Sequence, residues 1–92
     1  MEFQQLKYFI AVAEELNIGR AATRLQISQP QLTRQIQQLE EEFGTQRFQR
    51  TPRGVELTQA GEMFLRDARN IRDLMEQSVE RVREAGHKHH LD

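Results

Sequence analysis

The sequence has no cysteine, so it can form neither disulfide bonds nor thiolate metal sites, and a reducing compartment suits it. It has no apolar run long enough to span a bilayer, and its start lacks the basic and apolar segments of a secretory signal. These absences lead us to expect a soluble, cytoplasmic protein without membrane contact. The 92 residues suffice for one small domain with a modest core.

The sequence also lacks the patterns from which catalytic and cofactor sites are built. No glycine-rich phosphate loop, inward pair of carboxylates or ordered histidine supports catalysis, so we expect neither an enzyme nor a cofactor in this chain. His87, His89 and His90 could chelate a transition metal, but they lie in a terminal stretch with nothing to fix their geometry. We interpret residues 86–92 as a tail or the start of a hinge and predict no metal site.

An excess of positive charge is missing as well, because 13 basic and 14 acidic side chains give a formal net charge of −1. The average hides a segregation along the chain. Residues 17–54 hold three glutamates and six arginines, a local charge of +3. These arginines are Arg20, Arg24, Arg34, Arg47, Arg50 and Arg53. Phosphate responds to the local field on one face, so the composition allows nucleic-acid binding with modest non-specific affinity.

The most informative stretch begins a helix at Ser28. The Ser28 hydroxyl can accept from the backbone N–H of Gln31, whose side chain can reach back as in a capping box, and Pro30 fits the first turn. Gly44 suits the left-handed position after the helix, so the sequence predicts a helix over residues 28–43. One side of this helix is an apolar stripe made of Leu32, Ile36, Leu39 and Phe43.

The other side of this helix carries side chains that suit DNA base edges. Arginine offers a bidentate fork to guanine, glutamine offers one to adenine, and a threonine methyl can touch thymine. The candidates for DNA contact here are Gln29, Pro30, Gln31, Thr33, Arg34 and Gln37. The alternative is an ordinary solvated face, since glutamine and arginine are common surface residues. This helix alone leaves the two interpretations open.

Three acids, residues 40–42, occupy the last turn of the same helix, where they oppose the helix dipole and repel phosphate. They favour docking of this helix on DNA by its N-terminal end. The alternative is a solvated charge run that adds only solubility.

Two helices are predicted before this one. Apolar residues at helical spacing from Phe3 to Leu16 indicate a first helix that ends near Asn17 and supplies core. A second helix fits Gly19 to Leu25, with Asn17 as its cap. Because few residues separate it from the helix that begins at Ser28, the two must cross steeply, which is the helix-turn-helix arrangement.

A small β-wing is predicted after Gly44. Residues 47–50 and 55–57 read as two short strands, and residues 51–54 have the proline and glycine of a tight turn. Arg53 at the tip is a candidate for contact with the minor groove or with phosphate. Arg50 could make a similar contact or could brace the wing.

A long helix is predicted from Gln59 to about Ala85, capped by Thr58. Apolar residues in steps of four and three indicate a coiled-coil seam, which two further side chains widen. The predicted dimerisation residues are Phe64, Ala68, Ile71, Leu74, Met75, Ser78, Val79 and Val82. A second copy of the helix is the simplest partner, and packing on a domain outside this chain is the alternative. The organisation is therefore a DNA-binding unit (1–58), a linker and dimerisation helix (59–85) and a tail (86–92).

These elements carry motifs that resemble the N-terminal DNA-binding domain of LysR-type transcriptional regulators. The motifs that carry the resemblance are Met1 to Phe9, Ala21-Ala22, Ser28-Gln29-Pro30, Thr33 to Ile36, Leu39-Glu40, Gly44, Arg50 to Gly54 and Leu57 to Gly61. They cover nearly the whole chain, and the opening residues are most similar to regulators of aromatic-compound breakdown.

The resemblance implies a mainly α, winged helix-turn-helix fold with a two-stranded β-wing and a long C-terminal linker helix. It implies that the third helix enters the major groove, that the wing approaches the minor groove or flanking phosphates, and that the linker helix pairs antiparallel in a homodimer on a pseudo-palindromic promoter site. It also implies an effector-binding domain for a small molecule beyond this chain. The intact regulator could form a tetramer and could contact RNA polymerase.

Three residues depart from the pattern of this family. Gln31 stands where a small residue or proline is frequent, so it adds a base contact or serves only the cap. Gly19 replaces a frequent hydroxyl residue, which removes a side-chain contact to phosphate. Arg47 stands where the first wing strand usually buries an aliphatic side chain, and it could extend to water or pair with residues 40–42.

Overall fold

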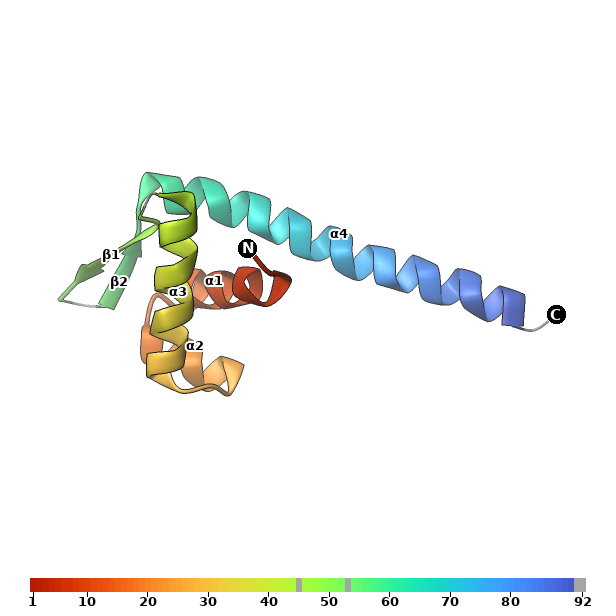
Figure 1. Ribbon diagram of the computed structural model, residues 1–92, viewed down its shortest axis with the longest axis horizontal. Helices are drawn as coiled ribbons and strands as arrows, with labels where there is room; N and C mark the ends of the chain where they lie inside the picture. The colour runs from red at the N-terminus through yellow and green to blue at the C-terminus, as the bar shows by residue number, and fades with distance from the viewer. Residues whose placement is uncertain (45, 53, 91–92) are drawn as a thin grey trace.

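The computed structural model describes residues 1–44, 46–52 and 54–90, with side chains described as far as His87. The elements within this part of the chain are α1 (Phe3–Glu15), α2 (Ile18–Leu25), α3 (Gln29–Phe43), β1 (Phe48–Thr51), β2 (Gly54–Leu57) and α4 (Gln59–His90). Figure 1 shows a body made of the first three helices and the β-hairpin, from which α4 extends, so the molecule measures 60 × 25 × 20 Å. This architecture confirms the predicted fold class.

Helix α1 is the centre of the core because α2, α3 and α4 all pack against it. The largest fully buried side chains are Leu6, Phe9, Ile10 and Val12 of α1 together with Leu32 and Leu39 of α3. The Phe9 ring lies 5.1 Å from the ring of Phe48 in the wing and 4.8 Å from that of Phe64 in α4, centroid to centroid. The prediction that Leu16 belongs to this core was wrong, because Leu16 ends α1 in the left-handed conformation and is exposed.

Side-chain caps start the helices close to where the sequence predicted. At the start of α2, Asn17 Oδ1 accepts from the Arg20 N–H at 2.8 Å. This helix begins at Ile18, one residue before the predicted start at Gly19. Ser28 Oγ accepts from the Gln31 N–H at 3.2 Å, but the described hydrogen bonds do not include a return contact from the Gln31 side chain, which is exposed. Half of the predicted capping box therefore forms, and Gly44 ends α3 with a φ of 68° as predicted.

The two strands of the wing pair antiparallel, with Phe48 opposite Leu57 and Arg50 opposite Val55. Strand β1 begins at Phe48 and not at Arg47, the predicted first residue. The wing rests on the end of α1, where the Leu16 carbonyl accepts from the Val55 N–H at 3.3 Å. A side chain at Gly54 would lie 2.8 Å from that carbonyl oxygen, and the φ of 136° there also favours glycine.

Helix α4 continues to His90, five residues beyond the predicted end at Ala85. The predicted tail therefore is helical over residues 86–90, and residues 91–92 lie outside the described part. A glycine weakens a helix by only about 1 kcal/mol relative to alanine, which is too little for Gly86 to end a long helix by itself. None of the helices in the described residues is both long and apolar enough to cross a membrane.

Candidate nucleic-acid interface

The N-terminal half of α3 presents a continuous polar surface, which we call the α3 face. A shallow depression on this face is lined by Gln29, Pro30, Thr33, Arg34 and Gln37. Thr33 is half-buried and the other side chains are exposed. The opposite side of the helix buries Leu32, Ile36 and Leu39, so packing on the core fixes the direction of the α3 face.

A groove of about 350 Å³ between α3 and the wing extends the α3 face. Thr33 and Gln37 line both the depression and the groove, and Arg50 of β1 forms part of the groove wall. The structure thus brings together six of the predicted site residues, namely Gln29, Pro30, Thr33, Arg34, Gln37 and Arg50. Arg53 lies outside the described residues.

Gln31 is the predicted contact residue that the structure separates from the others. It is exposed, but it lines neither the depression nor the groove. At 100° per residue it lies 100° from Pro30 and 60° from Arg34 around the helix, toward the side where Gln35 and Gln38 meet Gln5 of α1. Its contact with DNA therefore stays a prediction, at the edge of the α3 face.

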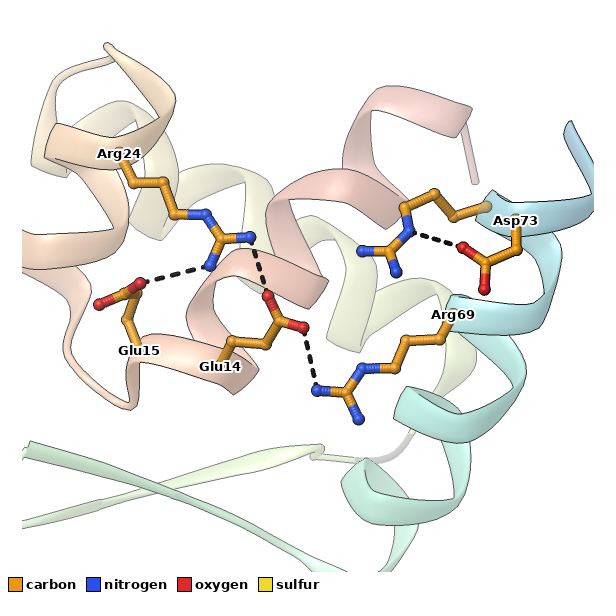
Figure 2. A network of polar contacts seen from close by, with 6 residues as sticks. Glu14, Glu15, Arg24, Arg69 and Asp73 are labelled. Carbon is orange, nitrogen blue, oxygen red and sulfur yellow. Dashed lines mark hydrogen bonds and ion pairs between the residues drawn. The ribbon is translucent and has the colours of Figure 1, made fainter. Parts of the chain in front are cut away.

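Two arginines of the positive segment are engaged by other side chains of the same chain. Figure 2 shows Arg24 of α2 between two carboxylates at the end of α1, 2.8 Å from Glu14 and 3.3 Å from Glu15. The hydrogen bond from Arg24 is the main reason why the pKa of Glu14 lies below its usual value. Burial acts in the opposite direction and raises this pKa, whereas a hydrogen bond from Arg69 lowers it further. Glu14 in turn raises the pKa of Arg24. Arg24 therefore adds little to the field that a phosphate would meet.

Arg47 is the second engaged arginine, with only 7% of its surface exposed. Its guanidinium lies 4.2 Å from the centre of the Phe43 ring and 5.3 Å from that of Phe64. Burial lowers the pKa of Arg47, and the charge of Glu40 partly opposes this. The side chain thus stacks on aromatic rings where the sequence predicted that it would extend to water or pair with residues 40–42.

The exposed arginines in the described part of residues 17–54 that lie outside an ion pair are therefore Arg20, Arg34 and Arg50. None of these three forms an ion pair with another described residue, so their charge is available to a ligand. Sequence reasoning counted Arg20 in the local charge but did not select it as a site residue. Its place in the first turn of α2, beside the Asn17 cap, was the signal that could have identified it.

Glu40 fixes the wing relative to the α3 face. Its Oε2 accepts from the backbone N–H of Arg47 at 2.8 Å and from that of Phe48 at 3.3 Å, at the point where β1 begins. The sequence placed Glu40 in an acidic end directed away from DNA and did not predict this contact. Sequence analysis also missed Gln46 and Gln49, which line the groove beside Arg50.

The start of α4 is tied to the same wing. The Thr58 N–H donates to the Arg47 carbonyl at 2.9 Å, and Thr58 Oγ1 accepts from the Gly61 N–H at 3.1 Å. A side chain at Gly61 would lie 2.1 Å from the Arg47 carbonyl oxygen, so only glycine allows this approach.

The apolar stripe of α4 has two parts. Its first part packs on the protein's own core, where Ala68 is completely buried and Phe64 contacts Phe9. The prediction that Ala68 faces a second copy was wrong, because the same helical side first covers α1 before it leaves the body. Phe64 is half-buried, and its contact with a second copy stays a prediction. The second part is exposed over Ile71, Leu74, Met75, Val79 and Val82, with Ser78 half-buried among them. We call this second part the α4 row.

Among the described side chains, no group of three or more potential metal ligands converges. His87 is exposed on α4. The side chains of His89 and His90 lie outside the described part of the structure.

Comparison with known proteins identifies the family. The family model "Bacterial regulatory helix-turn-helix protein, lysR family" matches residues 3–62. The HTH-type transcriptional regulator ClcR of Pseudomonas putida is 62% identical over 85 residues, which are 92% of this chain and 29% of ClcR. This chain therefore spans less than a third of the length of that relative.

Solved structures agree with this match. The crystal structure of a CbnR_DBD–DNA complex superposes with a TM-score of 0.89 at 55% identity and covers 94% of this chain and 99% of that one. A BenM_DBD/catB site 1 DNA complex superposes with a TM-score of 0.89 at 42% identity and covers 91% of this chain and 93% of that one. The chain thus belongs to the lysR family of bacterial regulatory helix-turn-helix proteins.

Proposed function

We propose that this chain is the DNA-binding domain of a bacterial LysR-type transcriptional regulator and binds double-stranded DNA in a sequence-specific way. The observation that carries the proposal is the α3 face, which joins Gln29, Thr33, Arg34 and Gln37 to Arg50 of the wing on one surface. In this reading the start of α3 enters the major groove, where these side-chain types recognise base edges. Arg50 and the wing then meet the minor groove or the flanking phosphates.

The acidic end of α3 supports docking by the opposite end. Glu40 is engaged with the wing backbone, and Glu42 pairs with the amino group of Met1. Glu41, the third acid, is exposed and leaves negative charge at the C-terminal end of the helix, whereas the described N-terminal half carries the exposed Arg34. The DNA complexes of CbnR_DBD and BenM_DBD, which share this fold, also support the proposal.

The α4 row supports a homodimer, since apolar side chains that are at least 40% exposed in one chain need a partner. A second copy of α4, antiparallel to the first, buries both rows at once and creates a twofold axis. Two α3 helices then reach successive major grooves about 34 Å apart, or a multiple of that distance, so the target is a pseudo-palindromic promoter site.

The proposal extends to the whole regulator, of which this chain spans a part. In the whole regulator a small-molecule effector binds a separate domain. At the promoter the regulator associates further to a tetramer and contacts RNA polymerase. The protein acts in the bacterial cytoplasm, on the DNA of the nucleoid. Neither catalysis nor a cofactor is assigned to this chain.

The experiment that tests the proposal is a selection from a pool of random DNA duplexes, followed by sequencing of the bound fraction. We expect enrichment of one motif that occurs twice in inverted orientation. Recovery of unenriched sequences with the chain properly folded would contradict sequence-specific binding, and recovery of a single motif copy would contradict the dimer alone.

A further inference from the structure

Helix α4 has to leave the body in a defined direction if it is to join two α3 faces at a fixed separation. Its buried contacts stop early, because Ala68 is the last buried residue of α4 in the described part. Arg69 follows directly, and its Nη2 lies 2.9 Å from Glu14 Oε2. This ion pair therefore connects the body to α4 at the point where close packing ends.

Glu14 is shared between two elements. One carboxylate oxygen holds Arg69 of α4, and the other lies 2.8 Å from Arg24 of α2, as Figure 2 shows. Helix α2 is the first helix of the helix-turn-helix, so a single side chain links that unit to the linker helix. Its neighbour Glu15 forms an ion pair with Arg24 and, among the described residues, with no residue of α4.

We propose that Glu14 is a positioning residue that fixes the direction of α4 relative to the helix-turn-helix and thereby sets which separation of half-sites the dimer accepts. This inference rests on the proposed function. Partly exposed ion pairs are weak, so we do not expect Glu14 to determine whether the chain folds. A small change in the direction of α4 becomes a large displacement at the far end of a 32-residue helix, however. The preference of the dimer for one half-site spacing therefore depends more on the direction of α4 than on the stability of the fold.

The test uses Glu14→Gln in the full chain and a series of duplexes that keep both half-sites but change their separation by one or two base pairs. The measured quantity is the ratio of affinities for the optimal and the altered spacing. We expect Glu14→Gln to reduce this ratio about three- to fivefold, as the loss of a pair of this kind allows. Affinity for a duplex with one half-site should stay the same, because the α3 face is untouched.

Glu15→Gln is the matched control, since it removes one negative charge from the next residue without touching Arg69. It should keep the wild-type ratio. Arg69→Gln should reproduce the effect of Glu14→Gln, and the two changes together should add nothing further. A Glu14→Gln chain that keeps the wild-type ratio would overturn the inference alone. A wild-type chain without any spacing preference would overturn this inference and the proposed dimer together.

Discussion

Arg34 and Arg47 have the same charge but opposite surroundings. Arg34 is exposed on the α3 face, whereas Arg47 is buried between the rings of Phe43 and Phe64. Arg24 is engaged with Glu14 and Glu15. A count of arginines along the sequence therefore overstates the field at the surface. The arginines that matter for DNA are those whose elements direct them outward.

Arg34→Ala should weaken binding to the selected site by on the order of 1–3 kcal/mol and relax its sequence preference, because a bidentate base contact is lost. Gln31→Ala is the control on the same helix. Since Gln31 lines neither the depression nor the groove, we expect its replacement to change the binding free energy by less than about 0.5 kcal/mol. Fluorescence anisotropy with specific and scrambled duplexes measures both. Unchanged discrimination by Arg34→Ala would exclude this role.

The pH dependence of stability should report the environment of Glu14. Its pKa is lowered in the folded chain by Arg24 and Arg69, with Glu15 the nearby like charge. The stabilisation is therefore present above the usual carboxyl pKa near 4.5 and is lost as the pH falls through the lowered value. Urea unfolding should show that Glu14→Gln costs at most about 1 kcal/mol at pH 7 and less than that at pH 3. A difference that stays constant between these pH values would contradict this assignment.

At the scale of elements, local chemistry could be predicted from sequence and tertiary contacts could not. Asn17, Ser28 and Gly44 act within one turn of their own position, so the helix boundaries they set were predicted closely. The burial of Arg47 depends on rings that approach from α3 and α4, and no local pattern reveals that meeting. The contact between Glu40 and the start of β1 likewise joins residues that fold back on each other after Gly44.

The periodicity of α4 shows the same limit. Its apolar stripe has one spacing throughout, so the sequence could not tell the part that covers α1 from the part that stays exposed. The division after Ala68 follows from the length of the body alone. The helix also continues beyond Gly86, because an isolated glycine destabilises a helix too little to end it.

The wing should lose its defined position when Glu40 is replaced. We expect Glu40→Ala to lower the free energy of unfolding by about 1–2 kcal/mol, because two backbone N–H groups lose a charged acceptor. Arg50→Ala should reduce the salt dependence of DNA binding by about one unit in the wild type and by less in the Glu40→Ala background. Glu41→Ala, at the next and exposed position, is the control. Equal effects of Arg50→Ala in both backgrounds would refute the positioning of the wing by Glu40.

At the scale of the whole molecule, the body and α4 have different functions. The body fixes the α3 face and the wing, and α4 carries the apolar row away from them (Figure 1). In the proposed dimer the twofold axis passes between two α4 helices, so the symmetry of the protein becomes the symmetry of its site.

The α4 row can be tested directly. Ile71→Asp combined with Met75→Asp should produce monomers, because two charges would be buried in the apolar seam. Asn70→Asp combined with Gln77→Asp adds the same charge on exposed positions that flank the row without belonging to it, and should leave the dimer intact. Sedimentation equilibrium distinguishes the two results. Dimers of the Ile71→Asp, Met75→Asp chain would show that the seam lies elsewhere.

The most direct measurement is a competition at physiological salt between the selected inverted repeat and a scrambled duplex of equal length and composition. If the α3 face reads bases in two half-sites, the chain should bind the repeat about a thousandfold more tightly or better. Equal affinity for both duplexes would mean that the surface holds phosphate without reading sequence, and it would contradict the account.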